Sequence, residues 1–267
     1  MISLAFSPCP NDTFMLDAWV HKKILNYLPV ITYIQDIQAL NEDALAGKYD
    51  VTKISVAMYP LIQHEYELLP TGAALGYGCG PLLVATKPYT LGDISSLHIA
   101  LPGEYTTAHL LLKKLLSTPA KKSFHLFSAI EKAVLNQEVD AGMLIHEGRF
   151  TYQQKQLYKI VDMGELWEKT YQLPLPLGVI AIKRNLPTTT KKQIYNSLYN
   201  SIQYAFHNPE ASASFVAYHA QEMDIEVRKQ HIQLYVNDYS LDISTKGEEA
   251  IQLLLGKDTQ ESIFFIP

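Results

Sequence analysis

Short apolar runs of strand length alternate with stretches of helical periodicity over the first two thirds of the chain. Continuous or alternating apolar residues over four to eight positions indicate strands, whereas apolar residues three and four positions apart indicate helices. The predicted strands are 2–6, 30–34, 51–54, 82–85, 98–101, 125–127, 141–145, 159–161 and 178–182. The predicted helices among them are 13–22, 39–46, 107–116 and 130–136. This alternation is typical of βαβ units, so we expect an α/β fold with mostly parallel sheets.

The pattern changes after about Pro187, beyond which only helical periodicity is found. The predicted helices of this block are 191–207, 209–221, 226–239 and 246–255. Helices without strands of their own need an apolar surface to cover. We therefore expect the C-terminal block to pack on a sheet formed earlier in the chain.

Two segments repeat the same order of elements. Residues 41–51 end a helix, turn, and open a strand with an aspartate, and residues 130–142 do the same later in the chain. The polar residues at the far ends of these two strands are Lys53, Ser55, His146 and Glu147. The repeat predicts two similar α/β lobes. Because ligands of open α/β sheets bind beyond the carboxyl ends of strands, these residues are expected to line a ligand cleft between the lobes.

Proline-containing transitions at 87–88 and 173–176 bracket the middle of the chain. They predict a discontinuous large lobe, residues 1–87 plus 174–267, and a small lobe, residues 88–173. Two crossing strands would join these lobes and could act as a hinge for closure over a ligand. A single linker between two continuous lobes is disfavoured, since no Gly/Ser-rich linker is present.

The composition is that of an ordinary globular protein, with 267 residues of which 48% are hydrophobic and 18% charged. The net charge is −5 and the basic residues are scattered, which argues against a nucleic-acid groove. The apolar runs are far shorter than the roughly 20 residues that span a bilayer. The N-terminus lacks the basic start and cleavage site of a secretion signal. We expect a cytoplasmic protein of unassigned oligomeric state that acts on a small molecule, with no membrane or nucleic-acid partner.

Resident cofactors and metals are not expected. Gly72, Gly76, Gly78 and Gly80 are not followed by a phosphate-loop lysine, and no GxGxxG opens a helix. No HExxH or paired CxxC motif is present, so no metal site is predicted. The two cysteines, Cys9 and Cys79, do not make a disulfide framework. Cys9 lies at a possible helix start, where the pKa of a thiol falls, but no base lies beside it in the sequence.

The first candidate site is the run from Ser7 to Phe14, which follows the first strand and opens a helix. Two prolines stiffen this turn. Asn11, Asp12 and Thr13 can cap the helix, and its free N–H groups would suit a carboxylate. A capped structural turn explains Asp12 and Thr13 equally well.

The second candidate is Lys53-Ile54-Ser55, at the end of a strand. Strand alternation places Lys53 and Ser55 on the same side, where they could hold an anionic or hydroxylated ligand. A surface lysine beside a helix cap is the alternative. The matching position of the internal repeat favours a functional role.

The third candidate, Thr106-Thr107, stands at another strand-to-helix turn. Adjacent threonines at a helix start can offer hydroxyl and backbone N–H groups to a carboxylate without a formal charge. Taken alone, this pair is more typical of a structural N-cap. The turn is the counterpart, in the middle of the chain, of the one that begins at Ser7.

The fourth candidate is His146, which follows an apolar strand at the expected cleft. Histidine accepts a proton near neutral pH, so His146 is the candidate general base. A core or surface histidine without a catalytic task is the alternative. Glu147 could orient the ring of His146 or simply be solvated.

Together these motifs resemble the 1,4-dihydroxy-6-naphthoate synthase family of the futalosine route to menaquinone. The resemblance covers nearly the full length and rests on Ser7-Pro8-Cys9-Pro10-Asn11-Asp12-Thr13-Phe14, Lys53-Ile54-Ser55, residues 72–81, Pro102-Gly103, Thr106-Thr107, Ile145-His146-Glu147, Arg149-Phe150-Thr151, residues 173–178, Tyr235-Val236-Asn237 and Ser240-Leu241-Asp242. Each motif is weak alone, and the combination is specific.

The resemblance implies a two-lobed fold like that of type 2 periplasmic binding proteins, used by a cofactor-independent enzyme. It implies conversion of cyclic dehypoxanthinylfutalosine, a carboxylate-bearing substrate, to 1,4-dihydroxy-6-naphthoate and dihydroxyacetone. It also implies that His146 is the proton acceptor and that the segments Lys53–Ser55 and Thr106–Thr107 contact the substrate. Tyr105 stands where the family often has a basic or imidazole side chain.

Two other functions stay open on the sequence. The chain could be the chorismate dehydratase of the same pathway, which a test of chorismate against the cyclic futalosine derivative would distinguish. It could also be a cytosolic, non-catalytic protein that binds a small acid. The absence of a secretion signal or lipid-anchor cysteine disfavours an exported binding protein.

Overall fold

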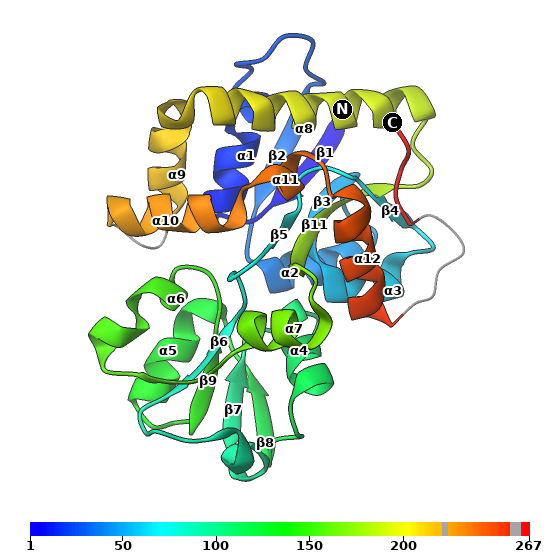
Figure 1. The fold of residues 1–267 in the computed structure, drawn as a ribbon. Helices are drawn as coiled ribbons and strands as arrows, with labels where there is room; N and C mark the ends of the chain where they lie inside the picture. Colours follow the sequence, from blue (N-terminus) through cyan, green and yellow to red (C-terminus); the bar gives the residue numbers. More distant parts are fainter. Residues whose placement is uncertain (221–223, 257–262) are drawn as a thin grey trace. The chain divides into compact units, whose positions relative to one another are not determined.

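A computed structural model describes residues 1–220, 224–256 and 263–267. The chain forms two compact units, the first from residues 1–76 and 176–267 and the second from residues 77–175 (Figure 1). The chain thus passes between the units twice. The first passage lies before the 87–88 transition singled out in the sequence, because β6 (Leu82–Ala85) pairs with two strands of the second unit's sheet.

The first unit contains a six-stranded mixed sheet. Its strands lie in the order β2 (Val30–Ile34), β1 (Ile2–Phe6), β3 (Val51–Ser55), β11 (Leu175–Lys183) and β4 (Tyr66–Leu68), with β5 (Ala74–Gly76) paired to β11. β1 is parallel to β2 and β3, whereas β11 is antiparallel to β3 and β4. The expectation of mostly parallel sheets is wrong here, because the strand that brings the chain back from the second unit runs against β3.

The second unit contains a five-stranded sheet of the same design. Its strands lie in the order β10 (Tyr158–Asp162), β6, β9 (Ala141–Leu144), β7 (His98–Leu101) and β8 (Lys121–Phe124). β7 is parallel to β8 and β9, and β6 is antiparallel to β9 and β10. β7, β8, β9 and β6 therefore occupy the places of β1, β2, β3 and β11 in the first unit. The internal repeat predicted from the sequence is confirmed in this topology.

Helices cover the sheet of the first unit. They are α1 (Pro10–Val20), α2 (Ile37–Leu45), η1 (Val56–Met58), α3 (Tyr59–Ile62), α8 (Thr188–His207), η4 (Pro209–Ser212), α9 (Ala213–His219), α10 (Ile225–Tyr235), α11 (Asp238–Leu241) and α12 (Ser244–Leu255). α8, α9 and α10 pack against α1, and a buried cluster that includes Leu4, Trp19 and Ile180 joins α1 to the sheet (Figure 1). The C-terminal helices thus pack on a sheet formed earlier, as predicted.

The second unit has fewer helices. They are η2 (Leu91–Ser96), α4 (Thr107–Leu115), α5 (Phe127–Leu135), α6 (Gly148–Thr151), η3 (Tyr152–Lys155) and α7 (Met163–Tyr171). α5 packs on β7 and β9, where Ile130 and Val134 join a buried cluster with Leu144. A Cβ atom at Gly142 would lie 2.5 Å from Ile130, so the close approach of α5 to β9 requires glycine there.

The predicted strand at 125–127 is wrong. The strand is β8, at 121–124, and most of its residues are exposed because it lies at the edge of the sheet. An edge strand buries little side-chain surface, so it needs no alternation of apolar and polar residues. The short strands β4 and β5 were not predicted, since three residues are too few for a periodic signal.

Two helix boundaries also differ from the prediction. Asn11 and Asp12 do not cap α1, which begins at Pro10 with Cys9 in the N-cap position. Proline favours the first helical position, and this places Asn11 and Asp12 inside the first turn. The predicted helix 226–239 divides into α10 and α11 because the Asn237 side chain accepts a hydrogen bond from the N–H of Tyr239 and begins a new helix.

The predicted helix 209–221 is also two elements, the 3₁₀ turn η4 and the helix α9. Its last predicted residue, 221, lies outside the described residues.

Candidate active site

In each unit, two parallel neighbouring strands end at the same edge of the sheet. In the first unit, β1 leads into the turn that begins at Ser7, and β3 ends at Ser55. In the second unit, β7 leads into the turn before Thr107, and β9 leads into the turn that contains His146. All four candidate segments of the sequence therefore occupy corresponding places in the two units.

At the opposite end of each strand pair, an aspartate connects the two parallel strands by hydrogen bonds. Oδ2 of Asp50 accepts hydrogen bonds from the backbone N–H and the hydroxyl of Ser3, at 2.9 and 2.8 Å. In the second unit, Oδ2 of Asp140 accepts a hydrogen bond from the N–H of His98 at 2.8 Å. This explains the aspartate that opens the strand in both copies of the repeat.

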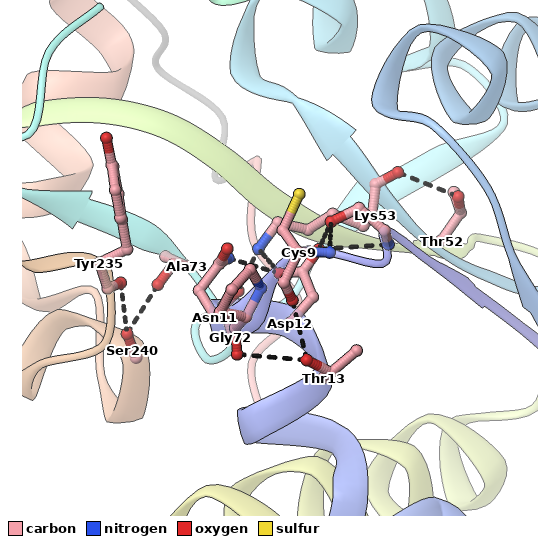
Figure 2. A network of polar contacts seen from close by, with 12 residues as sticks. Cys9, Asn11, Asp12, Thr13, Thr52, Lys53, Gly72, Ala73, Tyr235 and Ser240 are labelled. Carbon is pink, nitrogen blue, oxygen red and sulfur yellow. Dashed lines mark hydrogen bonds and ion pairs between the residues drawn. The ribbon is translucent and has the colours of Figure 1, made fainter. Parts of the chain in front are cut away.

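The Asp12 carboxylate is the centre of a buried polar network in the first unit. Its Oδ1 lies 2.8 Å from Nζ of Lys53 and accepts a hydrogen bond of 2.8 Å from the Asn11 side-chain amide. Its Oδ2 accepts hydrogen bonds from the hydroxyl and the N–H of Ser7, at 2.7 and 3.3 Å. Figure 2 shows Asn11 and Asp12 in the first turn of α1 with Lys53 beside them. We call Ser7, Asn11, Asp12 and Lys53 the Asp12–Lys53 centre.

The charges of this centre compensate each other. Both side chains of the ion pair are almost fully buried, with exposed fractions of 4% for Lys53 and 1% for Asp12. An ammonium group has three N–H donors, and Lys53 directs two of them to Asp12 and to the carbonyl oxygen of Gly72, the latter at 3.1 Å. The sequence suggested that the charge of Lys53 could hold an anion. Asp12 already balances that charge, and two of the three N–H donors of Lys53 are used within the protein.

The segment that carries the Gly72 carbonyl is fixed by α11. The carbonyl of Ser240 accepts hydrogen bonds from the N–H of Gly72 at 2.7 Å and from the hydroxyl of Thr71 at 3.1 Å. Gly72 has φ +84°, and a Cβ atom there would lie 2.7 Å from Ile180. Glycine is therefore required for the turn that presents this carbonyl to Lys53.

Three other predicted site residues of the first unit, Ser55, Ile54 and Thr13, lie outside the Asp12–Lys53 centre. Asn41 of α2 holds Ser55, accepting from its N–H at 2.9 Å and donating to its hydroxyl at 3.0 Å. The side chain of Ile54 is fully buried in the core. The hydroxyl of Thr13 donates to the carbonyl oxygens of Cys9 and Pro10, within its own helix (Figure 2). Ser55 is thus a positioned polar group, whereas Ile54 and Thr13 support the local structure.

In the second unit, Thr106 caps α4. This was one of the two interpretations of the Thr106-Thr107 pair in the sequence. Its Oγ1 accepts the N–H of His109 at 3.4 Å and donates to the carbonyl of Gly103 at 2.8 Å. Thr107 is buried in the first turn of the same helix. The N-terminus of α4 thus combines a hydroxyl cap with the backbone N–H groups that favour an anion.

His109 contacts both the turn before α4 and β8. Nδ1 lies 2.8 Å from the carbonyl of Glu104, and Nζ of Lys122 lies 3.3 Å from Nε2. Since a lysine can only donate, Nε2 is the acceptor and Nδ1 carries the proton. Burial lowers the pKa of His109 below its ordinary value.

His146 lies in a left-handed turn directly after β9, with φ +58°. This region is uncommon for residues other than glycine, and strained residues cluster at functional sites. Its ring packs edge-on against Phe127, with the centroids 4.5 Å apart. Glu147 is buried, so the interpretation of this residue as a solvated carboxylate is wrong.

Arg149 anchors the segment that follows His146. Its Nη1 donates to the carbonyl of Gly80 and its Nη2 contacts Oδ2 of Asp162, both at 2.6 Å. Oδ1 of Asp162 in turn caps α7, accepting the N–H of Gly164 at 2.8 Å. This clamp fixes the chain three residues after His146 to two other segments of the second unit.

Several residues of these networks were not predicted from the sequence as site residues. Among them are Asn41, Asp162, His109 and His231, whose Nε2 lies 3.0 Å from Oδ1 of Asn11. Asn11 and His231 are 220 positions apart, and no local pattern connects residues at that separation.

Among the residues that the structure describes, no group of three or more His, Cys, Asp and Glu side chains could hold a metal ion. None of the described helices is both long and apolar enough to cross a membrane.

Residues 2–259 match the family model described as menaquinone biosynthesis. A 1,4-dihydroxy-6-naphthoate synthase from Streptomyces coelicolor is 39% identical, covering 98% of this chain and 94% of the relative. A second, from Thermus thermophilus, is 38% identical, covering 96% of this chain and 93% of the relative.

Solved structures agree with the sequence comparison. The crystal structure of a protein from Archaeoglobus fulgidus is 35% identical with a TM-score of 0.91, covering 96% of this chain and 95% of that chain. The ligand-binding component of an ABC-type importer from Staphylococcus aureus is 14% identical with a TM-score of 0.69, covering 96% and 90%. The latter shows the fold alone, which is the two-lobed fold of periplasmic binding proteins. The chain belongs to the menaquinone biosynthesis family, together with the two 1,4-dihydroxy-6-naphthoate synthases.

Proposed function

We propose that the protein is a 1,4-dihydroxy-6-naphthoate synthase, a carbon–carbon lyase of menaquinone biosynthesis. Its substrate would be cyclic dehypoxanthinylfutalosine and its products 1,4-dihydroxy-6-naphthoate and dihydroxyacetone. The observation that carries the proposal is the identity of 38% or more to two such synthases over 96% or more of this chain. The cytoplasm is the proposed location, and no cofactor is part of the proposal.

His146 is the proposed general base. The substrate has an acidic C–H bond beside a carbonyl group, and removal of that proton would start the breaking of the ring C–O and C–C bonds. Formation of the aromatic naphthalene diol would drive the reaction. A positioned base contributes roughly 10²- to 10⁴-fold to such a step. Support comes from the left-handed turn of His146 after β9 and from the Arg149 clamp behind it.

The remaining predicted residues are proposed to bind and orient the substrate. The N-terminus of α4, with Thr106 and Thr107, suits a carboxylate because helix N-termini and hydroxyl groups stabilise anions. Ser55 and the third N–H of Lys53 would donate to neutral oxygen atoms. Ser7, Asn11 and Asp12 would hold Lys53 in place, with Thr13 and Ile54 as the supporting structure.

The test is incubation of the purified protein with cyclic dehypoxanthinylfutalosine, with products followed by absorbance and identified by mass. Appearance of 1,4-dihydroxy-6-naphthoate and dihydroxyacetone in equal amounts is the expected result. Binding without turnover would instead indicate a protein that only binds a small acid. If the protein shows no binding and no turnover of this substrate, the proposal is refuted, and chorismate becomes the next substrate to test.

A further inference from the structure

A chain of hydrogen bonds links α10 to the Asp12–Lys53 centre. Nε2 of His231 lies 3.0 Å from Oδ1 of Asn11, whose Nδ2 donates to Oδ1 of Asp12 at 2.8 Å. The same oxygen of Asp12 lies 2.8 Å from Nζ of Lys53. His231 is therefore connected to Lys53 through two intervening side chains.

The protons of this chain can be placed from chemistry. Asp12 forms an ion pair with Lys53, so its carboxylate only accepts hydrogen bonds and the Asn11 amide group must face it with Nδ2. The amide oxygen of Asn11 then faces His231, which must donate from Nε2. The reverse orientation of Asn11 would place its oxygen against the carboxylate. The N–H of His231 thus satisfies the Asn11 amide oxygen in the orientation that the Asp12 carboxylate requires.

Every member of the chain is shielded from solvent. The exposed fractions of the whole residues are 1% for His231, 6% for Asn11, 1% for Asp12 and 3% for Lys53. Water therefore cannot readily replace a lost donor, and a buried polar group without its partner is costly. The ring of His231 also packs on Tyr235, with centroids 4.5 Å apart, which limits its rotation.

We propose that His231 is a positioning residue of the active site, which acts through Asn11 to hold the Asp12–Lys53 pair in its working orientation. This inference rests on the proposed function, in which Lys53 donates to the substrate. The sequence around Ser7 gives no indication of the contact between His231 and Asn11, because His231 lies in a C-terminal helix.

The test compares three single variants of the full chain. His231→Phe keeps a ring that can pack on Tyr235 but removes the donor. His231→Gln keeps an N–H donor near the position of Nε2. Ser201→Ala is the matched control, since the Ser201 hydroxyl is buried and donates to the carbonyl of Met15 at 2.6 Å, which ties α8 to α1 without a contact to Asn11.

The expected kinetic result is a fall of kcat/KM by about ten- to a hundredfold in His231→Phe, because a small misplacement of a catalytic group costs that much. His231→Gln should recover most of the activity, and Ser201→Ala should leave kcat/KM near the wild-type value even where it lowers the melting temperature. Addition of His231→Phe to Asn11→Ala should cause no further loss, because both act on the same contact. Additive losses, or equal losses in Phe and Gln variants, would overturn the inference.

A crystal structure of each variant gives a readout that does not depend on the substrate. We expect the Asn11 amide to rotate and the contact between Lys53 and Asp12 to lengthen in His231→Phe but not in Ser201→Ala. An unchanged Asp12–Lys53 contact in His231→Phe would overturn the inference even if the proposed substrate were wrong. Wild-type protein without turnover, combined with the expected structural change, would refute the proposed function alone.

Discussion

Nζ of Lys53 lies 2.8 Å from Oδ1 of Asp12, and this buried ion pair joins the end of β3 to the first turn of α1. Burial of two charges costs solvation free energy, which their attraction offsets only when further hydrogen bonds are made. Here Ser7 and Asn11 donate to the carboxylate, and the Gly72 carbonyl accepts from the ammonium. Once both charges are buried, each side chain needs the other as its counter-charge.

Removal of one partner should therefore destabilise the fold. Asp12→Asn leaves the Lys53 ammonium buried without a counter-charge, and we expect a loss of about 3–5 kcal/mol in the free energy of unfolding. The double variant Asp12→Asn with Lys53→Met should regain much of this loss but stay inactive. Urea denaturation and turnover measure the two effects separately. Equal stability of Asp12→Asn and wild type would contradict the ion-pair account.

His146 gives a prediction that separates backbone strain from catalysis. Both His146→Ala and His146→Gly should lower turnover by at least about two orders of magnitude, since each removes the proposed general base. At φ +58° alanine keeps the strain, whereas glycine relieves it, so the glycine variant should be the more stable by about 1 kcal/mol. Thermal unfolding and kcat are the measurements. Near-normal turnover in either variant would remove His146 from the mechanism.

Arg149 should affect both stability and turnover, because it holds the turn that contains His146. Arg149→Met removes the contacts to Gly80 and Asp162 and leaves the Asp162 carboxylate buried, so we expect a loss of both stability and kcat. Lys155→Met is the matched control, because it removes an ion pair of 2.7 Å with Glu131 whose lysine is 41% exposed. The control should change stability by less than about 1 kcal/mol. Equal effects of the two variants would argue against the clamp.

His109 predicts part of the pH dependence of stability. Because burial lowers the pKa of His109 in the folded protein, the unfolded chain binds a proton first as pH falls through about 6.5. Stability from His109 is therefore full above that pH and is lost progressively below it. His109→Asn, which keeps a donor near the Nδ1 position, should flatten the curve of unfolding free energy between pH 7 and pH 5. An unchanged slope would contradict a buried neutral His109.

Features with a local or repeated signal could be predicted from the sequence. The apolar runs of β1, β3 and β9 are buried in sheet interiors, where hydrophobic patterning is strong. The aspartates Asp50 and Asp140 recur because each bonds the neighbouring parallel strand in its own unit. The repeat thus predicts two similar units, which the matching strand orders confirm.

Features that depend on distant residues could not be predicted. Strand direction is not encoded in periodicity, so the antiparallel placement of β6 and β11 was missed. The motif beginning at Ser7 was found, but its interpretation as a helix cap was wrong, because Pro10 starts the helix and Asp12 pairs with Lys53 instead. Lys53 could be predicted as a candidate residue. The pairing of its charge with Asp12 could not, because it depends on the tertiary structure.

The most direct test of the central claim is a comparison of kcat/KM for cyclic dehypoxanthinylfutalosine and for chorismate, measured on the same preparation of the full chain. The account predicts turnover of the cyclic futalosine derivative to 1,4-dihydroxy-6-naphthoate, no measurable dehydration of chorismate, and loss of the first activity in His146→Ala. Dehydration of chorismate without any formation of 1,4-dihydroxy-6-naphthoate would contradict it.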